Sequence, residues 1–513
     1  MTAVSSPAAA VFTTAFLSGV SSITSILIIY LDIYGTRIRT PWARITLFPA
    51  IWATAWQLVA RFSPVGHLMT WTPTQGIDAY VWMRPYFGPW GVNWIVGSLA
   101  VIVTDVVGTW FIGTDSVSAV TDTMGQAVPD ADLLGLHDSP EYVVVEQYTV
   151  RRGGGHILSL TTIVLALGIP SYFFKPTPLP THPESSTALV AGCMLPPPPR
   201  QGDPSSTFDR FLSETKHHVS DAKVDILLWP EGAVRFDNAD DRLKKLEMVQ
   251  NVTGGSFVGV TFEEPAPEDV PGHRPGTRRN GMALVGPHGV VFEYYKRNLV
   301  PFVESFPLSS SDEIPTIYEV EIPITKSGKT TRAIPITASI CLDFASPRVL
   351  DALPSRPALV LAPARTWHRD VSLAMWEQAR ARAEEIGSRV LFCDGGEDGV
   401  SGFAGHGMRE VYQVGPGSWT RAIGIEHPLR TSKTPYAEGG DWTMACLVFA
   451  MLGVGWFGEI AVAQLVSKYG KLLVGDRGGL RQVLAIVQGK FHSITGRHQQ
   501  GRRPEGEQQP LLA

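Results

Sequence analysis

Long apolar stretches without charged side chains constrain the folding of this 513-residue chain more than any other feature. Residues 8–31 contain no Asp, Glu, Lys or Arg, and about 20 apolar residues in a helix cross a hydrocarbon core about 30 Å thick. Similar stretches cover residues 45–60, 157–174 and 90–112, the last with one acidic interruption at Asp105. Another covers residues 442–466, with Glu459 inside it. Residues 45–60 are short for a span and could instead form a re-entrant or buried helix. We therefore predict about four spans before a polar middle region and one after it.

Composition agrees with a membrane protein and excludes several functions. The chain is 44% hydrophobic and only 18% charged, which is more apolar than a typical soluble enzyme. Its formal net charge of −5 offers no basic field for nucleic acid. The four cysteines are too few for a disulfide framework and lack the spacing of a metal site. We therefore expect no nucleic-acid partner, no metal and no cofactor.

The distribution of Lys and Arg predicts the orientation, because short non-translocated loops retain the positive charge. Basic residues gather between the first two spans, just before the fourth span and after the fifth span. With five spans, these three regions lie in the cytoplasm and the middle region is extracytoplasmic or lumenal. A cleaved signal peptide is the alternative for residues 8–31, but no Lys or Arg precedes Arg37. The triplet Asn251-Val252-Thr253 in the middle region is a glycosylation sequon, so a glycoprotein is expected.

The chain divides into four parts. Residues 1–185 form an N-terminal membrane region, residues 186–426 a polar domain, and residues 427–466 a linker with the last span. Residues 467–513 form a basic tail. Apolar residues recur at helical spacing in its first part, as in a helix that lies on an anionic membrane or packs on protein, and the end of the tail is expected to be disordered.

The polar domain has the alternating pattern of an α/β fold. The expected strands cover residues 188–194, 224–229, 257–262, 282–285, 290–295, 334–340, 359–361 and 390–393. The expected helices cover residues 207–219, 240–252 and 371–386, the last with Asp370 as N-cap and Gly387 at its end. The turn Pro287-His288-Gly289 predicts a hairpin.

Three reactive side chains stand at or just past the ends of expected strands. They are Glu231 after Trp229-Pro230, Lys296 after Tyr295, and Cys341 after Ile340. Each alone has a common structural explanation: a carboxylate at a helix start, a charge at a strand edge, or a small core residue. Together they supply a general base, an oxyanion stabiliser and a nucleophile without a metal. This set suffices for acyl transfer.

In this order and with these neighbours, the three segments resemble the carbon-nitrogen hydrolase (nitrilase) superfamily over roughly residues 188–407. The resemblance implies a Glu231-Lys296-Cys341 triad and a nitrilase-like four-layer α-β-β-α sandwich inserted in a helical transmembrane region. The segment Leu299-Val300-Pro301-Phe302, followed by Glu304 and Pro307, resembles the apolipoprotein N-acyltransferase branch. Membrane spans on both sides of the catalytic domain are also typical of that branch.

Two segments depart from the branch pattern. Leu342-Asp343 stand where the branch has an aromatic residue and Glu, and the Asn expected near the next strand end is replaced within residues 362–367, which contain Arg365. The triad is intact, so the departures bear on the acceptor substrate. Arg382 and Glu385 match the helix after the cysteine, where such a pair usually holds structure.

The resemblance implies a membrane-bound acyltransferase with a cysteine thioester intermediate. The implied donor is a phospholipid and the implied acceptor is an amine, as in a lipoprotein. Glu304 would support Lys296 or the acceptor, or would be a surface glutamate of a loop. Two alternatives stay open: a membrane-tethered hydrolase of the amidase or nitrilase type, and a non-catalytic membrane binding module.

Aromatic side chains near the triad segments predict an entrance for the acyl chain. They are Phe302, Phe306, Trp367 and Trp376. Exposed aromatic residues beside a membrane serve lipid entry or interfacial anchoring, while core packing is the alternative for each of them.

Overall fold

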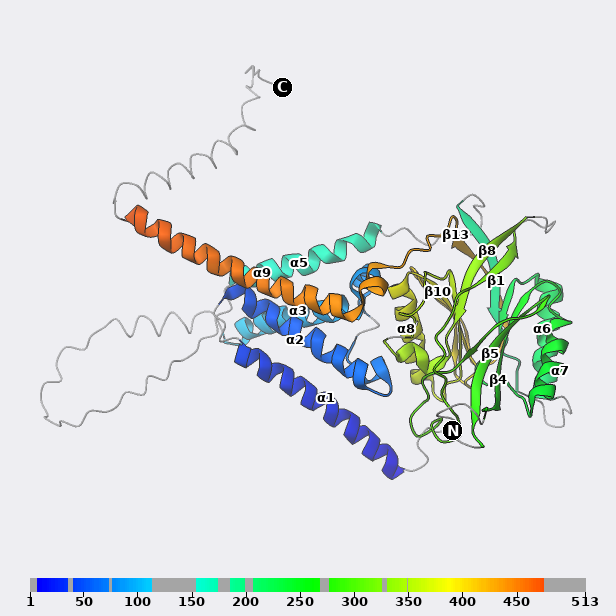
Figure 1. Ribbon diagram of the computed structural model, residues 1–513. Coiled ribbons are helices and arrows are strands. Elements are labelled where there is room, and N and C mark those ends of the chain that lie inside the picture. The colour runs from blue at the N-terminus through cyan, green and yellow to red at the C-terminus, as the bar shows by residue number, and fades with distance from the viewer. Residues whose placement is uncertain are drawn as a thin grey trace, which may run out of the picture. The chain divides into compact units, whose positions relative to one another are not determined.

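The computed structural model describes residues 7–35, 40–72, 76–112, 154–173, 185–198, 206–267, 276–324, 330–347 and 349–474 (Figure 1). The chain forms two compact units, Met1–Ala450 and Met451–Ala513. The expected amphipathic and disordered parts of the tail lie outside the described residues. All contacts discussed below lie within the first unit.

The apolar stretches form long helices. These are α1 (Pro7–Gly35), α2 (Pro41–Phe62), α3 (Arg84–Ile112), α5 (Gly154–Gly168) and α9 (Pro435–Val474), with short 3₁₀ turns η1 (Gly66–Met69), η2 (Asp78–Met83) and η3 (Ile169–Phe173). Within the described residues, four stretches are long and apolar enough to cross a membrane: Thr14–Gly35, Asp78–Gly108, His156–Phe173 and Pro435–Val462.

Helix α2 differs from the expectation of a fifth span. It is 22 residues long, but it is not among the four candidate spans. Ala50, Ala53 and Trp56 on this helix are fully buried, which agrees with the buried-helix alternative. Helix α2 is therefore more buried in protein than α1, whose candidate span is only 6% buried.

One carboxylate connects three of the helices. Asp441, next to a kink in α9 at Gly440, accepts hydrogen bonds from Gln57 of α2 (3.0 Å), Trp90 of α3 (3.0 Å) and Tyr436 of α9 (2.8 Å). Because three donors share one oxygen, the start of α9 is held against α2 and α3.

The polar domain contains two mixed β-sheets, so the predicted α/β class is confirmed. The first sheet has the order β13-β1-β2-β4-β5-β6, with β3 beside β4. Its strands are β1 (Ser186–Cys193), β2 (Ile226–Leu228), β3 (Val234–Arg235), β4 (Phe257–Pro265), β5 (Arg278–Gly286), β6 (Gly289–Tyr295) and β13 (Trp419–Glu426). The second sheet has the order β12-β11-β10-β9-β8-β7. Its strands are β7 (Tyr318–Pro323), β8 (Thr331–Ala338), β9 (Leu359–Ala364), β10 (Arg389–Asp394), β11 (Val400–Gly405) and β12 (Met408–Val414).

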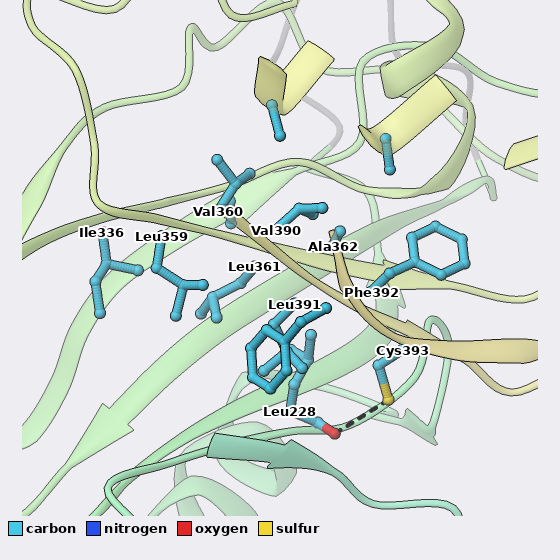
Figure 2. Packing of buried hydrophobic residues seen from close by; sticks show 14 of the residues in the cluster. Leu228, Ile336, Leu359, Val360, Leu361, Ala362, Val390, Leu391, Phe392 and Cys393 are labelled. Atoms are coloured by element: carbon cyan, nitrogen blue, oxygen red, sulfur yellow. Dashed lines mark hydrogen bonds between the residues drawn. The ribbon is translucent and has the colours of Figure 1, made fainter. Parts of the chain in front are cut away.

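The two sheets pack face to face. Leu189 and Met282 of the first sheet and Ile336 and Leu391 of the second belong to one buried cluster. Figure 2 shows side chains of β8, β9 and β10 gathered in this cluster together with Leu228 of β2. Burial of this apolar surface, at about 25 cal/mol per Å², is the main stabilising force between the sheets.

Three helices cover the outer faces of the sheets. Helices α6 (Thr207–Ala222) and α7 (Ala239–Gln250) bury Phe208, Phe211 and Leu246 against Trp229 and neighbours of the first sheet. Helix α8 (Arg369–Ile386) packs Trp376 onto Phe392 of the second sheet, with ring centroids 5.8 Å apart. Figure 1 shows α6 and α7 on one side of the sheets and α8 on the other.

Most of the expected elements are present, and five strands were missed. All eight expected strands overlap observed ones, and the turn before Gly289 (φ 112°) joins the antiparallel strands β5 and β6. β3, β7 and β11–β13 have no counterpart among the expected strands; β12, for example, exposes much of its length and lacks a continuous apolar run. The N-cap of α8 is His368 rather than Asp370, and Gly387 ends the helix at φ 71° as predicted.

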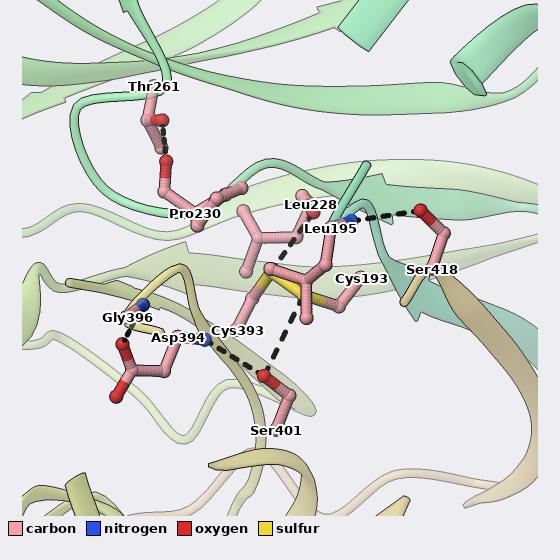
Figure 3. Close-up of a disulfide and its surroundings, with 10 residues drawn as sticks. All are labelled: Cys193, Leu195, Leu228, Pro230, Thr261, Cys393, Asp394, Gly396, Ser401 and Ser418. Atoms are coloured by element: carbon pink, nitrogen blue, oxygen red, sulfur yellow. Dashed lines mark hydrogen bonds between the residues drawn. A yellow bond between two sulfur atoms is a disulfide. The ribbon is translucent and has the colours of Figure 1, made fainter. Parts of the chain in front are cut away.

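A disulfide between Cys193 and Cys393 links the two sheets (Figure 3). Cys193 is the last residue of β1, and Cys393 lies near the end of β10. Their Cα atoms are 5.5 Å apart, and their sequence separation is 200. Cys341 and Cys446 are free. The sequence did not predict this single bridge, because pairing over such a separation depends on how the two sheets pack.

The sequon has an exposed asparagine and a buried threonine. Asn251 caps the C-terminal end of α7, and Thr253 is 1% exposed, with its hydroxyl donating to Gln250 O at 2.9 Å. Glycosylation stays a prediction.

Candidate active site

The structure brings the three predicted triad residues together at one end of the sheets. Glu231 follows β2, Lys296 follows β6, and Cys341 begins the 3₁₀ turn η4 (Cys341–Ala345) after β8. Their exposed fractions are 4%, 1% and 5%. Strand ends on rigid sheets therefore carry each of these reactive side chains into a buried site.

Lys296 is the centre of the polar contacts. Its Nζ donates to Glu231 Oε1 at 2.6 Å and to the carboxylate of Glu304 at 2.8 Å. Glu304 is held in turn, because its Oε2 accepts the Val300 N–H at 2.8 Å and its own N–H donates to Val300 O at 2.9 Å. Glu304, expected either to support Lys296 or to lie free on the surface, contacts the lysine.

Cys341 has a backbone conformation that few residues adopt. Its φ is +46°, in the left-handed region that costs a non-glycine residue about 1 kcal/mol or more. The thiol lies within hydrogen-bonding reach of the Glu231 side chain and of the Arg365 backbone N–H. The turn thus directs the thiol at a carboxylate on one side and a backbone donor on the other.

Burial and charge determine the protonation states of the three groups. Burial raises the pKa of Glu231 to about 7, although Lys296 acts in the opposite direction. Burial and then the charge of Glu231 hold the pKa of the Cys341 thiol well above its usual value. Burial by itself lowers the pKa of Lys296. The negative charges of Glu231, Cys341 and Glu304 have a larger effect, so the pKa of Lys296 is well above its usual value. At rest the site holds a neutral thiol beside an ammonium group.

Sequence reasoning missed Asn280 on β5, which fixes the orientation of Glu231. Asn280 is 3% exposed, and its Nδ2 donates to Glu231 Oε1 at 2.7 Å. Its backbone carbonyl accepts the Lys296 N–H at 2.9 Å. No motif marks this residue in the sequence, since only the pairing of β5 with β4 and β6 brings it to the site.

Asp343, which departs from the branch pattern, connects the nucleophile turn to the lysine loop. Its buried carboxylate accepts hydrogen bonds from Tyr294 OH at 2.8 Å, Asn298 N at 2.7 Å and Ile340 N at 3.2 Å. A shorter acid at this position therefore serves as a structural acceptor between the segments that carry Lys296 and Cys341.

Of the four aromatic residues expected at the acyl-chain entrance, three are exposed and one is buried. Phe302, Phe306 and Trp367 are 85%, 67% and 40% exposed. Trp376 is 1% exposed and packs in the core against Phe392. Including Trp376 in the entrance was wrong, because its position on the inner face of α8 directs the ring to the sheet.

A pocket of about 920 Å³ opens beside Glu231. Its wall combines residues of α6, the turn after β2, β3 and the loops after β1, β9 and β10. The apolar part includes Pro196, Phe208, Phe211 and Val234, and the charged part includes Arg365 and Glu263. Among the described residues, no group of three or more His, Cys, Asp or Glu side chains could hold a metal ion.

The Arg382–Glu385 pair has the structural contacts predicted for it. The two side chains form a buried ion pair within α8, and Glu385 Oε1 also accepts Arg84 Nη1 at 3.4 Å. The pair therefore connects α8 to the first residue of α3 and does not reach the triad contacts.

No family model matches the chain. The chain is 26% identical over 430 residues to an apolipoprotein N-acyltransferase from Methylococcus capsulatus. The aligned region covers 80% of this chain and 73% of that protein.

Solved amidase structures from Nesterenkonia match about half of the chain, with low TM-scores. One amidase from Nesterenkonia sp. is 15% identical and covers 47% of this chain and 91% of its own, with a TM-score of 0.35. A cysteine-to-serine mutant of the Nesterenkonia AN1 amidase from the nitrilase superfamily is 16% identical and covers 50% and 95%, with a TM-score of 0.36.

The similarity to the M. capsulatus protein extends over the membrane region as well as the catalytic domain, since it covers 80% of the chain. The chain thus resembles apolipoprotein N-acyltransferase, as its motifs indicated.

Proposed function

We propose that the protein is a membrane-bound acyltransferase that carries an acyl group as a thioester on Cys341. The observation that carries the proposal is the buried convergence of Glu231, Lys296 and Cys341, with Lys296 Nζ 2.6 Å from Glu231. Helices long enough to cross a membrane stand before and after this domain, and a nitrilase-like four-layer sandwich inserted in a membrane region accounts for both features.

The chemistry follows from the protonation states. Glu231 as carboxylate takes the proton from the Cys341 thiol, and the thiolate attacks the ester carbonyl of the donor. The ammonium group of Lys296 stabilises the tetrahedral oxyanion. Collapse expels the donor alcohol, which receives the proton from Glu231, and leaves the thioester. An amine then attacks the thioester carbonyl and loses a proton to Glu231. Collapse of this second tetrahedral intermediate forms the amide and expels the Cys341 thiolate, which takes the proton back from Glu231.

The proposed donor is a phospholipid and the proposed acceptor is an amine, such as that of a lipoprotein. Similarity to an apolipoprotein N-acyltransferase supports both. A membrane-tethered amidase or nitrilase is the second candidate, because the same triad can pass the acyl group to water. Incubation of the thioester enzyme with an amine or with buffer alone distinguishes these two, since an acyltransferase releases the acyl group far faster to the amine.

The triad is tested by mass spectrometry of the protein after incubation with phospholipid. We expect a fatty acyl adduct on Cys341 and none in Cys341→Ala. Lys296→Met and Glu231→Gln should lower the rate of adduct formation about 10²-fold, the size typical of an oxyanion or acid-base group. An unchanged rate in either variant would remove the role assigned to that residue.

We further propose that the catalytic domain is extracytoplasmic or lumenal and the C-terminal tail cytoplasmic. The Cys193–Cys393 disulfide supports this location, because such bonds persist in oxidising compartments. The disulfide carries the proposal more than the distribution of Lys and Arg, because that distribution counts α2 as a span and α2 is not among the four candidate spans. The candidate span in α9 separates the tail from the catalytic domain in either case. Protease added to one side of sealed vesicles should never cleave both the tail and the catalytic domain.

The exposed aromatic segment is the proposed entrance for the acyl chain. Phe302 and Phe306 lie on either side of Glu304, which contacts Lys296. Phe302→Ser with Phe306→Ser should depress turnover of a long-chain phospholipid far more than turnover of a short soluble ester. Leu243→Ser, which changes an exposed residue of α7, is the matched control. Equal losses on both substrates would contradict the entrance and favour the tethered hydrolase.

A further inference from the structure

Arg365 is a charged residue between the triad and the 920 Å³ pocket, and its side chain has no role in the mechanism proposed above. It follows β9 directly, and its backbone N–H lies in hydrogen-bonding reach of the Cys341 thiol. Its side chain is exposed and lines the pocket beside Glu231 and Gly232. One residue therefore contacts the nucleophile through its backbone and the pocket through its guanidinium group.

The guanidinium group lies close to the turn that carries Glu231. A Cβ atom at Gly232 would lie 3.8 Å from Arg365 Nη1. Gly232 has φ +61° and follows Glu231 in the turn after β2. The guanidinium group thus approaches the turn that carries the proposed general base.

Three other charged residues of the pocket wall already have partners. Lys245 pairs with Asp241 at 2.8 Å, Arg210 donates to Pro197 O, and Glu231 pairs with Lys296. Within the described residues, Arg365 makes no ion pair and no side-chain hydrogen bond. An exposed guanidinium group without a partner presents up to five N–H donors in a planar fork.

The side chains that line the pocket carry charges of both signs. Glu263 and Glu397 also line it, so an anion is not attracted by a uniform field and must contact Arg365 itself. Prolines and the rings of Phe208 and Phe211 form the apolar wall. Arg235 of β3 also lines the pocket with an exposed guanidinium group, but only Arg365 adjoins Cys341 through its own backbone. The pocket therefore combines an apolar wall with a guanidinium group next to the nucleophile, which suits an amphiphilic molecule with an anionic group close to its ester.

We propose that Arg365 is a specificity-determining residue that binds the phosphodiester group of the acyl donor and thereby presents the adjacent ester carbonyl to Cys341. This inference rests on the proposed function. The guanidinium fork matches two phosphate oxygens, and such charge-assisted pairs are stronger than neutral hydrogen bonds. Since phosphate and ester are separated only by a glycerol unit in a phospholipid, one residue beside Cys341 can read the first while the thiol attacks the second.

The test compares two donors that differ only in the phosphodiester head group: dihexanoyl phosphatidylglycerol and dihexanoylglycerol. The rate of acyl-adduct formation on Cys341 of the full-length protein is measured for each. Arg365→Gln should lower kcat/KM for the phospholipid about 10-fold to 100-fold, the loss of a charge-assisted contact, and leave the neutral donor within about twofold. Arg365→Lys keeps the charge without the fork, so it should restore part of the preference.

Arg369→Gln is the matched control, since Arg369 is an exposed residue at the start of α8 outside the pocket wall. It should leave both rates unchanged. Equal losses on the two donors in Arg365→Gln would overturn the inference, because the side chain would then act on the nucleophile. A loss confined to the later transfer to an amine would also overturn it, since the anion would then belong to the acceptor. If the unmodified protein forms no adduct from either donor, the proposed function itself fails.

Discussion

In the proposed mechanism, the protonation of Glu231 decides when the site can act. Because burial raises its pKa to about 7, a large fraction of the general base carries a proton at slightly acidic pH. Protonated Glu231 cannot accept the thiol proton of Cys341. The same shift links folding to pH: protonation of Glu231 stabilises the folded state most below about pH 4.5, and this contribution is lost as the pH rises through about 7.

The first prediction concerns the pH dependence of acylation. With an uncharged ester as donor, the rate of adduct formation on Cys341 should rise through about pH 7, because Glu231 loses its proton there. Measurement between about pH 5 and pH 9 checks this. In Glu231→Gln the residual rate should lack this rise. A rate that falls as the pH increases through 7 would assign the titration to another group.

Asn280 is the residue that the structure adds to the site, and it carries the second prediction. Asn280→Leu removes the donor to Glu231 Oε1 and should slow acylation about tenfold, roughly one charge-assisted hydrogen bond. Asn280→Asp places a second carboxylate beside Glu231, so the pH at which the rate rises should shift upwards. A pH profile identical to that of the unmodified protein in Asn280→Asp would show that residue 280 does not act on Glu231.

At the scale of elements, the nucleophile turn η4 depends on a contact with the N-terminal region. Gly66 in η1 has φ +54°, and a Cβ atom there would lie 2.0 Å from the backbone oxygen of Ala345. Ala345 ends the turn that Cys341 begins. The backbone that follows α2 therefore packs directly on the element that positions the thiol.

The third prediction follows from this close approach. Gly66→Ala forces η1 or η4 to move, so it should lower the acylation rate of Cys341 as well as the melting temperature; overpacking costs about 1–3 kcal/mol. Gly76→Ala is the matched control, because Gly76 also has positive φ (+76°) but no atom within 4 Å of the added Cβ. It should lower stability only. Equal acylation rates in the two variants would contradict a role for the contact in positioning Cys341.

At the scale of the whole molecule, the two sheets are joined by packing and by one covalent bond. Leu195, Leu228 and Pro230 lie around the Cys193–Cys393 bridge on one side and Asp394 on the other (Figure 3). Asp394 accepts the Thr366 N–H at 2.9 Å and the Gly396 N–H at 2.9 Å. The bridge thus lies between the segment that carries Glu231 and the loops that carry Arg365.

The fourth prediction concerns this bridge. Cys193→Ala with Cys393→Ala should lower the free energy of unfolding by about 2–5 kcal/mol, as expected for a cross-link that closes a long loop. The measurement is denaturant unfolding of the purified protein, with Cys446→Ser, a free exposed cysteine, as control. Peptide mapping of unreduced protein should recover the two cysteines as one linked pair. Recovery of both as free thiols would contradict the bridge and the proposed oxidising location.

The sequence by itself determined the features that local chemistry controls. Long apolar stretches with few charges form helices α1, α3, α5 and α9, since a helix is the structure that satisfies backbone groups in an apolar environment. Strand ends followed by Glu231, Lys296 and Cys341 indicated both the site and the family resemblance, because the backbone around a reactive group retains a recognisable local pattern. Short apolar runs likewise predicted the inner strands of the two sheets.

Only the tertiary structure decided which residues from distant segments meet. Asn280 reaches Glu231 through strand pairing, Cys193 meets Cys393 through the packing of two sheets, and Trp376 turns inward on α8. The sequence placed Trp376 near the triad segments but not on a face, since the direction of a helix face depends on what the helix packs against. Arg365 likewise shows its relation to the pocket only when α6, β3 and the loop after β9 are assembled.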